Sequence, residues 1–148
     1  MRISIIVPMY YGQKYVKQMI NQVDQCAKEA DGIDVELILY NDCPEEEIKV
    51  MPCEHIQNIK CINADQNLGI QGARVQGLKH ATGEYVLFLD QDDIIKPQYI
   101  KSQMNMIGNA DAVVCRVIHN KRLHYTDSFR FEAVSYTHLR AHETDQYL

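Results

Sequence analysis

The chain has 148 residues, of which 46% are hydrophobic and 24% charged, and its formal net charge is -5 at pH 7. That composition is ordinary for a soluble globular protein, and the length suffices for one domain with a hydrophobic core. The negative charge, with Lys and Arg scattered along the chain, argues against a nucleic-acid-binding surface. No apolar stretch reaches the roughly 20 residues of a transmembrane helix, so only peripheral membrane contact stays open.

Strand and helix patterns alternate along the chain. The apolar run 3–10 predicts a buried first strand, because polar Gln13 and Lys14 follow it in place of the small-residue cleavage site of a secretory signal. Apolar residues three or four apart predict a helix over 13–29 and another from Pro97 to Ile107. Further strands are predicted over 33–40, 59–62, 85–89 and 111–117, and a helix over 70–80. The alternation predicts an α/β fold with a mainly parallel sheet and helices on both faces.

The five cysteines are odd in number and lack CxxC spacing. Reduced thiols in a cytoplasmic protein are the simplest interpretation of that pattern.

Three acids, Asp90, Asp92 and Asp93, directly follow the run 85–89. Such an apolar run suits a strand covered on both faces, and open α/β sheets bind ligands at the carboxyl ends of their strands. In an extended chain, Asp90 and Asp92 would point to the same side. Paired carboxylates without nearby Cys or His favour Mg²⁺ or Mn²⁺, whose remaining positions are filled by water and substrate phosphates. A solvated acidic turn is the alternative.

The segment before the 70–80 helix contains Gly69 and Gly72, which allow close approach of the backbone. A Gly-rich helix start favours anions such as phosphate, because its N–H groups are free. Neither GxGxxG nor GxxxxGK[ST] is present, so dinucleotide-binding and P-loop interpretations lose their main support. We expect Thr82-Gly83 to close the helix as a Gly C-cap.

Four blocks over residues 4 to about 107 resemble, in order, the donor half of a family 2 glycosyltransferase of the inverting GT-A type. They are residues 5–10 (IIVPMY), 36–42 (ELILYND), 67–77 (NLGIQGARVQG) and 90–92 (DQD, similar to the family's DXD metal motif). The resemblance implies a GT-A-like, Rossmann-type sandwich. It also implies an enzyme that transfers a sugar, with inversion, from a nucleotide-diphospho-sugar to an acceptor hydroxyl, with a UDP-sugar as the usual donor and Mn²⁺ or Mg²⁺ as cofactor.

The resemblance also implies roles for individual residues. The nucleotide-sugar would be contacted by Pro8, Tyr10, Asp42, Asn67, Gly69, Arg74, Asp90 and Gln91. The metal would be held by Asp92, with Asp90 and Asp93 beside it. Arg74 would pair with the diphosphate or buttress the acids, and an ordinary ion pair with Asp90 is the alternative.

The chain departs from the family pattern at the rim of the expected nucleotide pocket. Tyr11 and Val75 stand where Asn is frequent, Asn41 replaces the first of two acids, and Cys43-Pro44 replaces a Gly-Ser pair. These departures leave the identity of the donor open.

No residue after Asp93 matches the family's catalytic base, and residues 134–148 have neither periodicity nor an apolar face. That last segment resembles the translated sequencing-adapter tails of truncated reading frames. We therefore expect residues 1–133 to be the nucleotide-diphospho-sugar-binding part of a GT-A domain that continues past about Ala133, and residues 134–148 to be a non-native or disordered tail.

Two other functions stay open: a non-catalytic nucleotide-sugar-binding fragment that lacks the acceptor half, and a nucleotidyltransferase of similar architecture. The segment 9–13 (MYYGQ) is not the Gly-rich basic loop that the latter would carry. As a glycosyltransferase, the chain would act on a glycan or lipid-linked acceptor in bacterial polysaccharide or cell-wall biosynthesis. Its location would be the cytoplasm, at or near the inner face of the membrane.

Overall fold

The computed structural model describes residues 1–108, 110, 112–113, 117–119, 122–124 and 139–140. In chain order its elements are β1 (Arg2–Met9), α1 (Gln13–Glu29), β2 (Asp34–Asn41), β3 (Asn58–Asn63), α2 (Gly69–Leu78), β4 (Tyr85–Phe88), α3 (Tyr99–Ile107), β5 (Val117–His119), β6 (Arg122–His124) and β7 (Leu139–Arg140). The predicted alternation of strands and helices is confirmed through α3.

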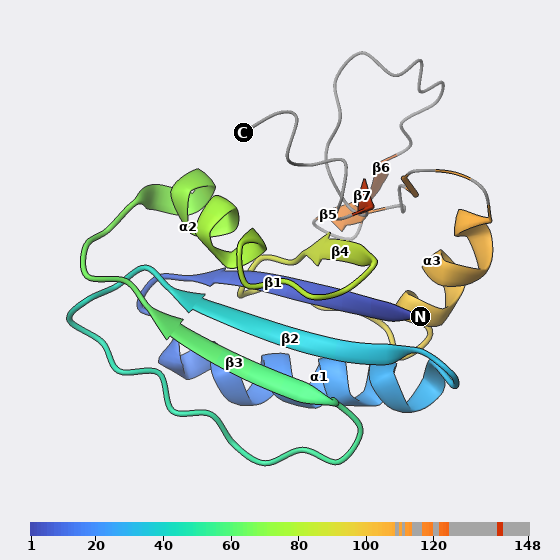
Figure 1. Cartoon of the computed structure of the whole chain (residues 1–148), viewed down its shortest axis with the longest axis horizontal. Coiled ribbons are helices and arrows are strands. Elements are labelled where there is room, and N and C mark those ends of the chain that lie inside the picture. Colours follow the sequence, from blue (N-terminus) through green and yellow to red (C-terminus); the bar gives the residue numbers. More distant parts are fainter. Residues whose placement is uncertain (109, 111, 114–116, 120–121, 125–138, 141–148) are drawn as a thin grey trace.

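The main sheet has the order β3-β2-β1-β4-β7, and strands β1 to β4 are all parallel (Figure 1). The short β7 pairs antiparallel with β4, while β5 and β6 form a separate two-stranded ladder. From β1 the chain first builds outward through β2 and β3, and then crosses back to place β4 on the other side of β1. The strand order therefore reverses between β1 and β4, which is where open α/β sheets form a ligand crevice.

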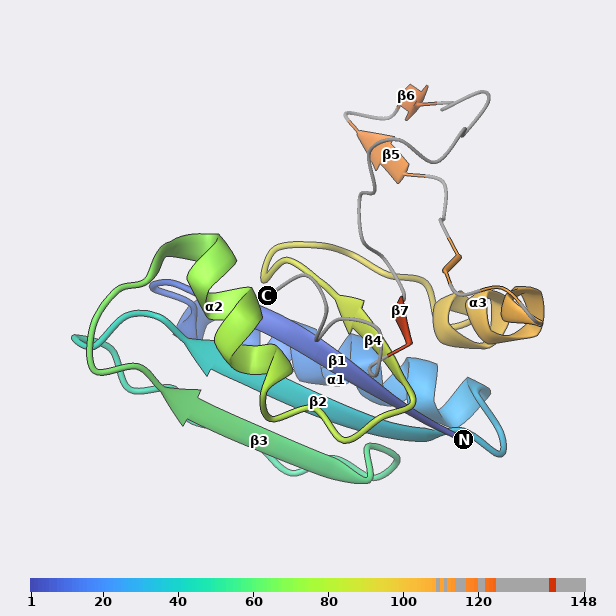
Figure 2. The same ribbon diagram turned by 45° about the horizontal axis from the view of Figure 1, so that its top comes forward.

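Helices cover both faces of the sheet, as predicted (Figures 1 and 2). Alternate side chains of β1 face opposite ways, so Ile5 packs with α1 and α3 in the larger cluster, whereas Ile6 packs with Leu78 of α2 in the smaller one. Gly77 lets α2 approach β1 closely, because a Cβ there would lie 2.5 Å from Cγ2 of Ile6. This close approach holds the last turn of α2 against β1.

The amino end of α1 is held by a residue far along the chain. Its N-cap, Gly12, has no side chain to accept a hydrogen bond, and the Gln13 N–H instead donates to the carboxylate of Glu46 at 3.0 Å. A carboxylate at a helix amino terminus is favourable, since it meets unpaired N–H groups and the positive end of the helix dipole. The segment 45–47 is a loop that supplies this acid.

Two local predictions need correction or fall outside the described residues. Helix α2 ends at Leu78 with Lys79 as its C-cap, so Gly83 is not the cap. Gly83 is required for packing, because a Cβ at that position would lie 2.6 Å from the backbone nitrogen of Ser4. Most of the strand predicted over 111–117, and all of the segment 134–148 except residues 139–140, lie outside the described residues.

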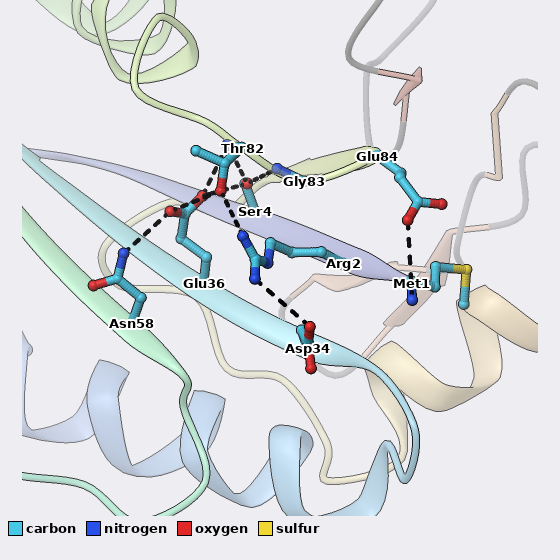
Figure 3. Close-up of polar contacts among 9 residues, drawn as sticks. All are labelled: Met1, Arg2, Ser4, Asp34, Glu36, Asn58, Thr82, Gly83 and Glu84. Carbon is cyan, nitrogen blue, oxygen red and sulfur yellow. Dashed lines mark hydrogen bonds and ion pairs between the residues drawn. The ribbon is translucent and has the colours of Figure 1, made fainter.

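A buried carboxylate, Glu36 of β2, connects the strands near their amino ends (Figure 3). It accepts hydrogen bonds from the Ser4 hydroxyl at 2.6 Å and the Thr82 N–H at 3.0 Å, and it pairs with Lys60 Nζ at 2.7 Å. Burial opposes ionisation of Glu36, but these donors outweigh it and lower its pKa from 4.5 to about 2. The network ties β1, β2 and β3 to the segment that leads into β4.

Candidate functional site

A pocket of about 370 Å³ lies at the carboxyl ends of β1, β2 and β4 and at the start of α2. This is the edge of the sheet where the strand order reverses between β1 and β4. The pocket is lined by Pro8, Met9, Tyr10, Asp42, Asn67, Gly69, Ile70, Ala73, Asp90, Gln91 and Asp92.

The predicted site residues come together here, with two exceptions. Every residue predicted to contact the nucleotide-sugar lines the pocket except Arg74, and of the predicted metal ligands only Asp93 does not line it. The lining residues not predicted are Met9, Ile70 and Ala73. Met9 ends a buried strand and Ala73 is a fully buried helix residue, so in sequence both look like ordinary core positions. Ile70 is 52% exposed, which only the folded structure reveals.

The acids lie in a turn, residues 90–93, which we call the acid turn. The Asp93 N–H donates to the Asp90 carbonyl at 3.1 Å, and the Asp90 N–H donates to the Asp93 carboxylate at 3.3 Å. Strand β4 has already ended at Phe88, so the premise that strand alternation places Asp90 and Asp92 on one side is wrong. Local side-chain to backbone bonding of this kind is what allows Asp to replace strand geometry with a turn.

Arg74 of α2 supports the acid turn from the side. Its Nη2 lies 2.7 Å from Oδ1 of Asp90, while its buried Nε has no hydrogen-bond partner among the described residues. Partial burial raises the pKa of Asp93, and the charges of Asp90 and Asp92 raise it further, against a backbone hydrogen bond and Arg74. The turn is therefore a concentration of negative charge that Arg74 offsets only in part.

Gln91 joins the acid turn to the end of β1. Its Oε1 accepts from the Tyr10 N–H at 3.0 Å, and its Nε2 donates to the Tyr10 carbonyl at 3.1 Å. Gly12 makes room for this side chain, because a Cβ there would lie 2.7 Å from Oε1 of Gln91. The side-chain amide thus pairs with the N–H and C=O of Tyr10 in the way that the backbone of a neighbouring strand would.

On the other side of the pocket, Asp42 and Asn67 shape the chain as it enters α2. The buried Asp42 accepts from the Leu68 N–H at 2.8 Å, and Asn67 accepts from the Gly69 N–H at 2.8 Å. Gly69 adopts a left-handed φ of 72°, a conformation that glycine takes without a Cβ penalty. Two N–H groups of this segment are thereby satisfied within the protein and are not left for an anion.

Tyr10, which lines the pocket, forms an aromatic pair with the adjacent Tyr11. Their rings meet edge to face with centroids 4.7 Å apart, and they are 48% and 52% exposed. Tyr11 has a left-handed φ of 45°, which costs a non-Gly residue roughly 1 kcal/mol and which Asn tolerates better. Tyr11, which stands where Asn is frequent in the family that the sequence resembles, therefore has a strained backbone conformation.

The donor set at the acid turn fits Mg²⁺ or Mn²⁺ shared with a phosphate ligand. Within the described part of the chain, no group of three or more His, Cys, Asp and Glu residues could hold a metal by itself. Mg²⁺ commonly takes only one or two carboxylates and completes its shell with water and substrate phosphates. The Asp92 carboxylate lines the pocket and makes no hydrogen bond or ion pair with another described residue, so its oxygens are available.

Among the described residues, no helix is long and apolar enough to cross a membrane.

Comparison with known proteins gives a consistent family match. Residues 4–145 match the family described as Glycosyl transferase family 2. The chain is 31% identical over 104 residues to the poly(ribitol-phosphate) beta-N-acetylglucosaminyltransferase TarS of Staphylococcus aureus, covering 68% of this chain and 18% of that protein. It is 30% identical over 106 residues to the minor teichoic acid biosynthesis protein GgaB of Bacillus subtilis, covering 69% of this chain and 11% of that protein. The chain therefore spans less than a fifth of the length of either relative.

Solved structures agree with the sequence matches. The crystal structure of S. aureus TarS 1-349 in complex with UDP-GlcNAc superposes with a TM-score of 0.57 and 25% identity, over 74% of this chain and 32% of that one. The corresponding structure in complex with UDP superposes with a TM-score of 0.56 and 27% identity, again over 74% of this chain. The GT-A-like α/β fold predicted from sequence is thus confirmed.

Proposed function

The chain belongs to glycosyl transferase family 2, and from that premise we propose that its pocket binds a nucleotide-diphospho-sugar donor. UDP-GlcNAc is the donor to test first, because the TarS structure that superposes on this chain was solved with that ligand. The family match covers residues 4–145, and every residue that lines the pocket lies within that range.

One observation carries the proposal: four separate segments bring polar groups to one pocket at the switch point of the sheet. Tyr10 follows β1, Asp42 follows β2, Asn67 precedes α2, and Asp90 and Asp92 follow β4. An aromatic ring and several acceptors around one crevice suit a ligand with a flat base, a ribose and a diphosphate. Pro8, Gly69 and Gln91 complete the wall, and Arg74 brings a positive charge behind Asp90.

We assign the metal to Asp92, with Asp90 and Asp93 beside it in the acid turn. Bound there, Mn²⁺ or Mg²⁺ would neutralise charge on the leaving diphosphate. Asp92 is the strongest candidate because its carboxylate is exposed and unpaired among the described residues, whereas Asp90 is paired with Arg74. Asp93 accepts a backbone hydrogen bond and serves chiefly to hold the turn.

The proposed reaction is transfer of the sugar with inversion. An acceptor hydroxyl attacks the anomeric carbon opposite the departing nucleoside diphosphate, and a base accepts the hydroxyl proton. We assign that base to no described residue. The names of TarS and GgaB point to a cell-wall glycan or polyol-phosphate polymer as the acceptor class, which would place the reaction at the cytoplasmic face of a bacterial membrane.

A second candidate function is donor binding without transfer. It stays a candidate because transfer needs a base for the acceptor proton, and we assign that role to none of the described residues. The two functions share the pocket and the metal, and they differ only in turnover.

Calorimetry of UDP binding, with and without Mn²⁺, tests the proposal on the wild type and on Asp92→Asn. We expect binding that Mn²⁺ strengthens in the wild type, with that enhancement lost in Asp92→Asn. The matched control is Asp31→Asn, which removes an exposed carboxylate beyond the end of α1 and away from the pocket. Equal enhancement by Mn²⁺ in all three proteins would refute the metal assignment, and absence of UDP binding by folded wild type would refute the donor site.

A further inference from the structure

The backbone at the end of the acid turn is hydrogen-bonded to a residue of α1 that does not line the pocket. Gln22 of α1 donates from Nε2 to the Asp93 carbonyl at 2.8 Å, and its Oε1 accepts from the Ile95 N–H at 3.2 Å. Its Nε2 also lies 3.5 Å from Sδ of Met19, so the amide is engaged at both its nitrogen and its oxygen. A half-buried glutamine with this many partners is fixed in one orientation.

The same helix face makes a second contact one turn later. Cys26, four residues after Gln22, donates from Sγ to the Lys96 carbonyl at 3.1 Å. The backbone of residues 93–96 therefore lies along α1 and is held by side chains of that helix. Because α1 packs firmly against the sheet through the larger core cluster, it provides a rigid support.

Gln22 and Gln91 attach the acid turn to two different elements. Gln91 lies within the turn and binds the backbone of Tyr10, whereas Gln22 lies outside it and binds the backbone at Asp93 and Ile95. Asp92 stands between these two attachments. The turn is therefore attached both to the end of β1 and to α1.

We propose that Gln22 is a positioning residue for the metal-binding carboxylates of the acid turn. This inference rests on the proposed function and adds to it a residue that does not line the pocket. Carboxylates that repel one another would spread apart in a loose turn, and a metal would then have to order the turn as it binds. The Gln22 amide orders the turn beforehand, so the affinity for the metal is retained.

The test is Gln22→Met, which removes the amide but keeps an unbranched side chain of similar length and helix propensity. The matched control is Gln25→Met, on the same helix at an exposed position for which the structure gives no side-chain hydrogen bond. Two affinities are measured for each protein: that for MnCl₂ in the presence of saturating UDP, and that for UDP in EDTA. Hydrogen exchange of the Ile95 amide and thermal unfolding are followed in parallel.

We expect Gln22→Met to weaken Mn²⁺ binding by on the order of tenfold, the loss expected for two backbone hydrogen bonds that hold the turn. The UDP affinity in EDTA should stay unchanged, the Ile95 amide should exchange faster, and Gln25→Met should behave as wild type. A purely structural role would lower the unfolding temperature while leaving the Mn²⁺ affinity unchanged, and that result would overturn the inference.

The proposed function fails separately, if folded wild type binds no UDP. Wild type that binds UDP but not Mn²⁺ would overturn both the metal assignment and the role of Gln22, while leaving the nucleotide site standing. Each result is read from a different titration, so the two failures are distinguishable.

Discussion

The side-chain amide of Gln91 makes two hydrogen bonds with the backbone of a single residue, Tyr10, at 3.0 and 3.1 Å. The two residues are 81 positions apart, and they join the ends of β1 and β4 across the switch point of the sheet. This contact sets the distance between Tyr10 and the acid turn.

Gln91→Glu should weaken UDP binding by several-fold without unfolding the protein. The new carboxylate can still accept from the Tyr10 N–H, but it faces the Tyr10 carbonyl without a proton to donate and adds a charge beside Asp90 and Asp92. Calorimetry and thermal unfolding measure the two effects. Gln57→Glu, at an exposed position just before β3, is the control and should bind UDP as wild type does.

Arg74→Met should weaken UDP binding on the order of tenfold in the presence of Mn²⁺. The change removes the 2.7 Å contact to Asp90 and leaves the charges of the acid turn without their counterion. Arg74→Lys keeps the charge but not the planar guanidinium, so it should recover only part of the loss. An unchanged UDP affinity of Arg74→Met in the same titration would mean that Asp90 is positioned by the turn alone.

Stability at low pH should depend on Glu36. Its folded-state pKa of about 2 lies below the ordinary value of 4.5, so its contribution is complete above pH 4.5 and is lost as the pH falls toward 2. That contribution is at most on the order of 3 kcal/mol. Glu36→Gln should lower the free energy of unfolding at pH 7 by a similar amount and flatten its dependence on pH between 4.5 and 2.

Urea denaturation at several pH values gives both quantities, and Glu84→Gln provides the comparison. Glu84 is 65% exposed and its contact with the amino terminus is long, at 3.9 Å (Figure 3). Exposed pairs of this kind contribute well under about 1 kcal/mol. Similar losses of unfolding free energy in the two variants would show that the buried Glu36 network stabilises the protein no more than an exposed ion pair does.

Gly77→Ala should destabilise the protein by about 1 to 3 kcal/mol although alanine favours helices. The added Cβ would lie 2.5 Å from Cγ2 of Ile6, whose side chain is fully buried in the core. The lower unfolding temperature should be accompanied by weaker UDP binding, because α2 carries the Gly69 side of the pocket. Gln76→Ala, at the neighbouring position, should change neither property.

Much of the fold was predictable because the local pattern and the tertiary environment agree. The predicted helix over 13–29 is confirmed at both ends, since its apolar stripe matches the stripe that packs on the sheet. The end of α2 was mispredicted because Gly83 resembles a C-cap in sequence, while its actual constraint comes from Ser4, 79 residues away. A close contact between distant segments leaves no local signal.

The order of strands and helices, the family, and the types of side chain gathered in the site follow from residue pattern alone. Periodicity reports which face of each element is buried, and motif order survives in a single chain without knowledge of contacts. How the acids are held became visible only in the folded chain: they lie in a turn rather than a strand, with Arg74 paired to Asp90 and the amides of Gln91 and Gln22 bonded to neighbouring backbone. Those attachments depend on how α1, α2 and β1 pack around the turn, and packing between distant segments has no periodic trace in sequence.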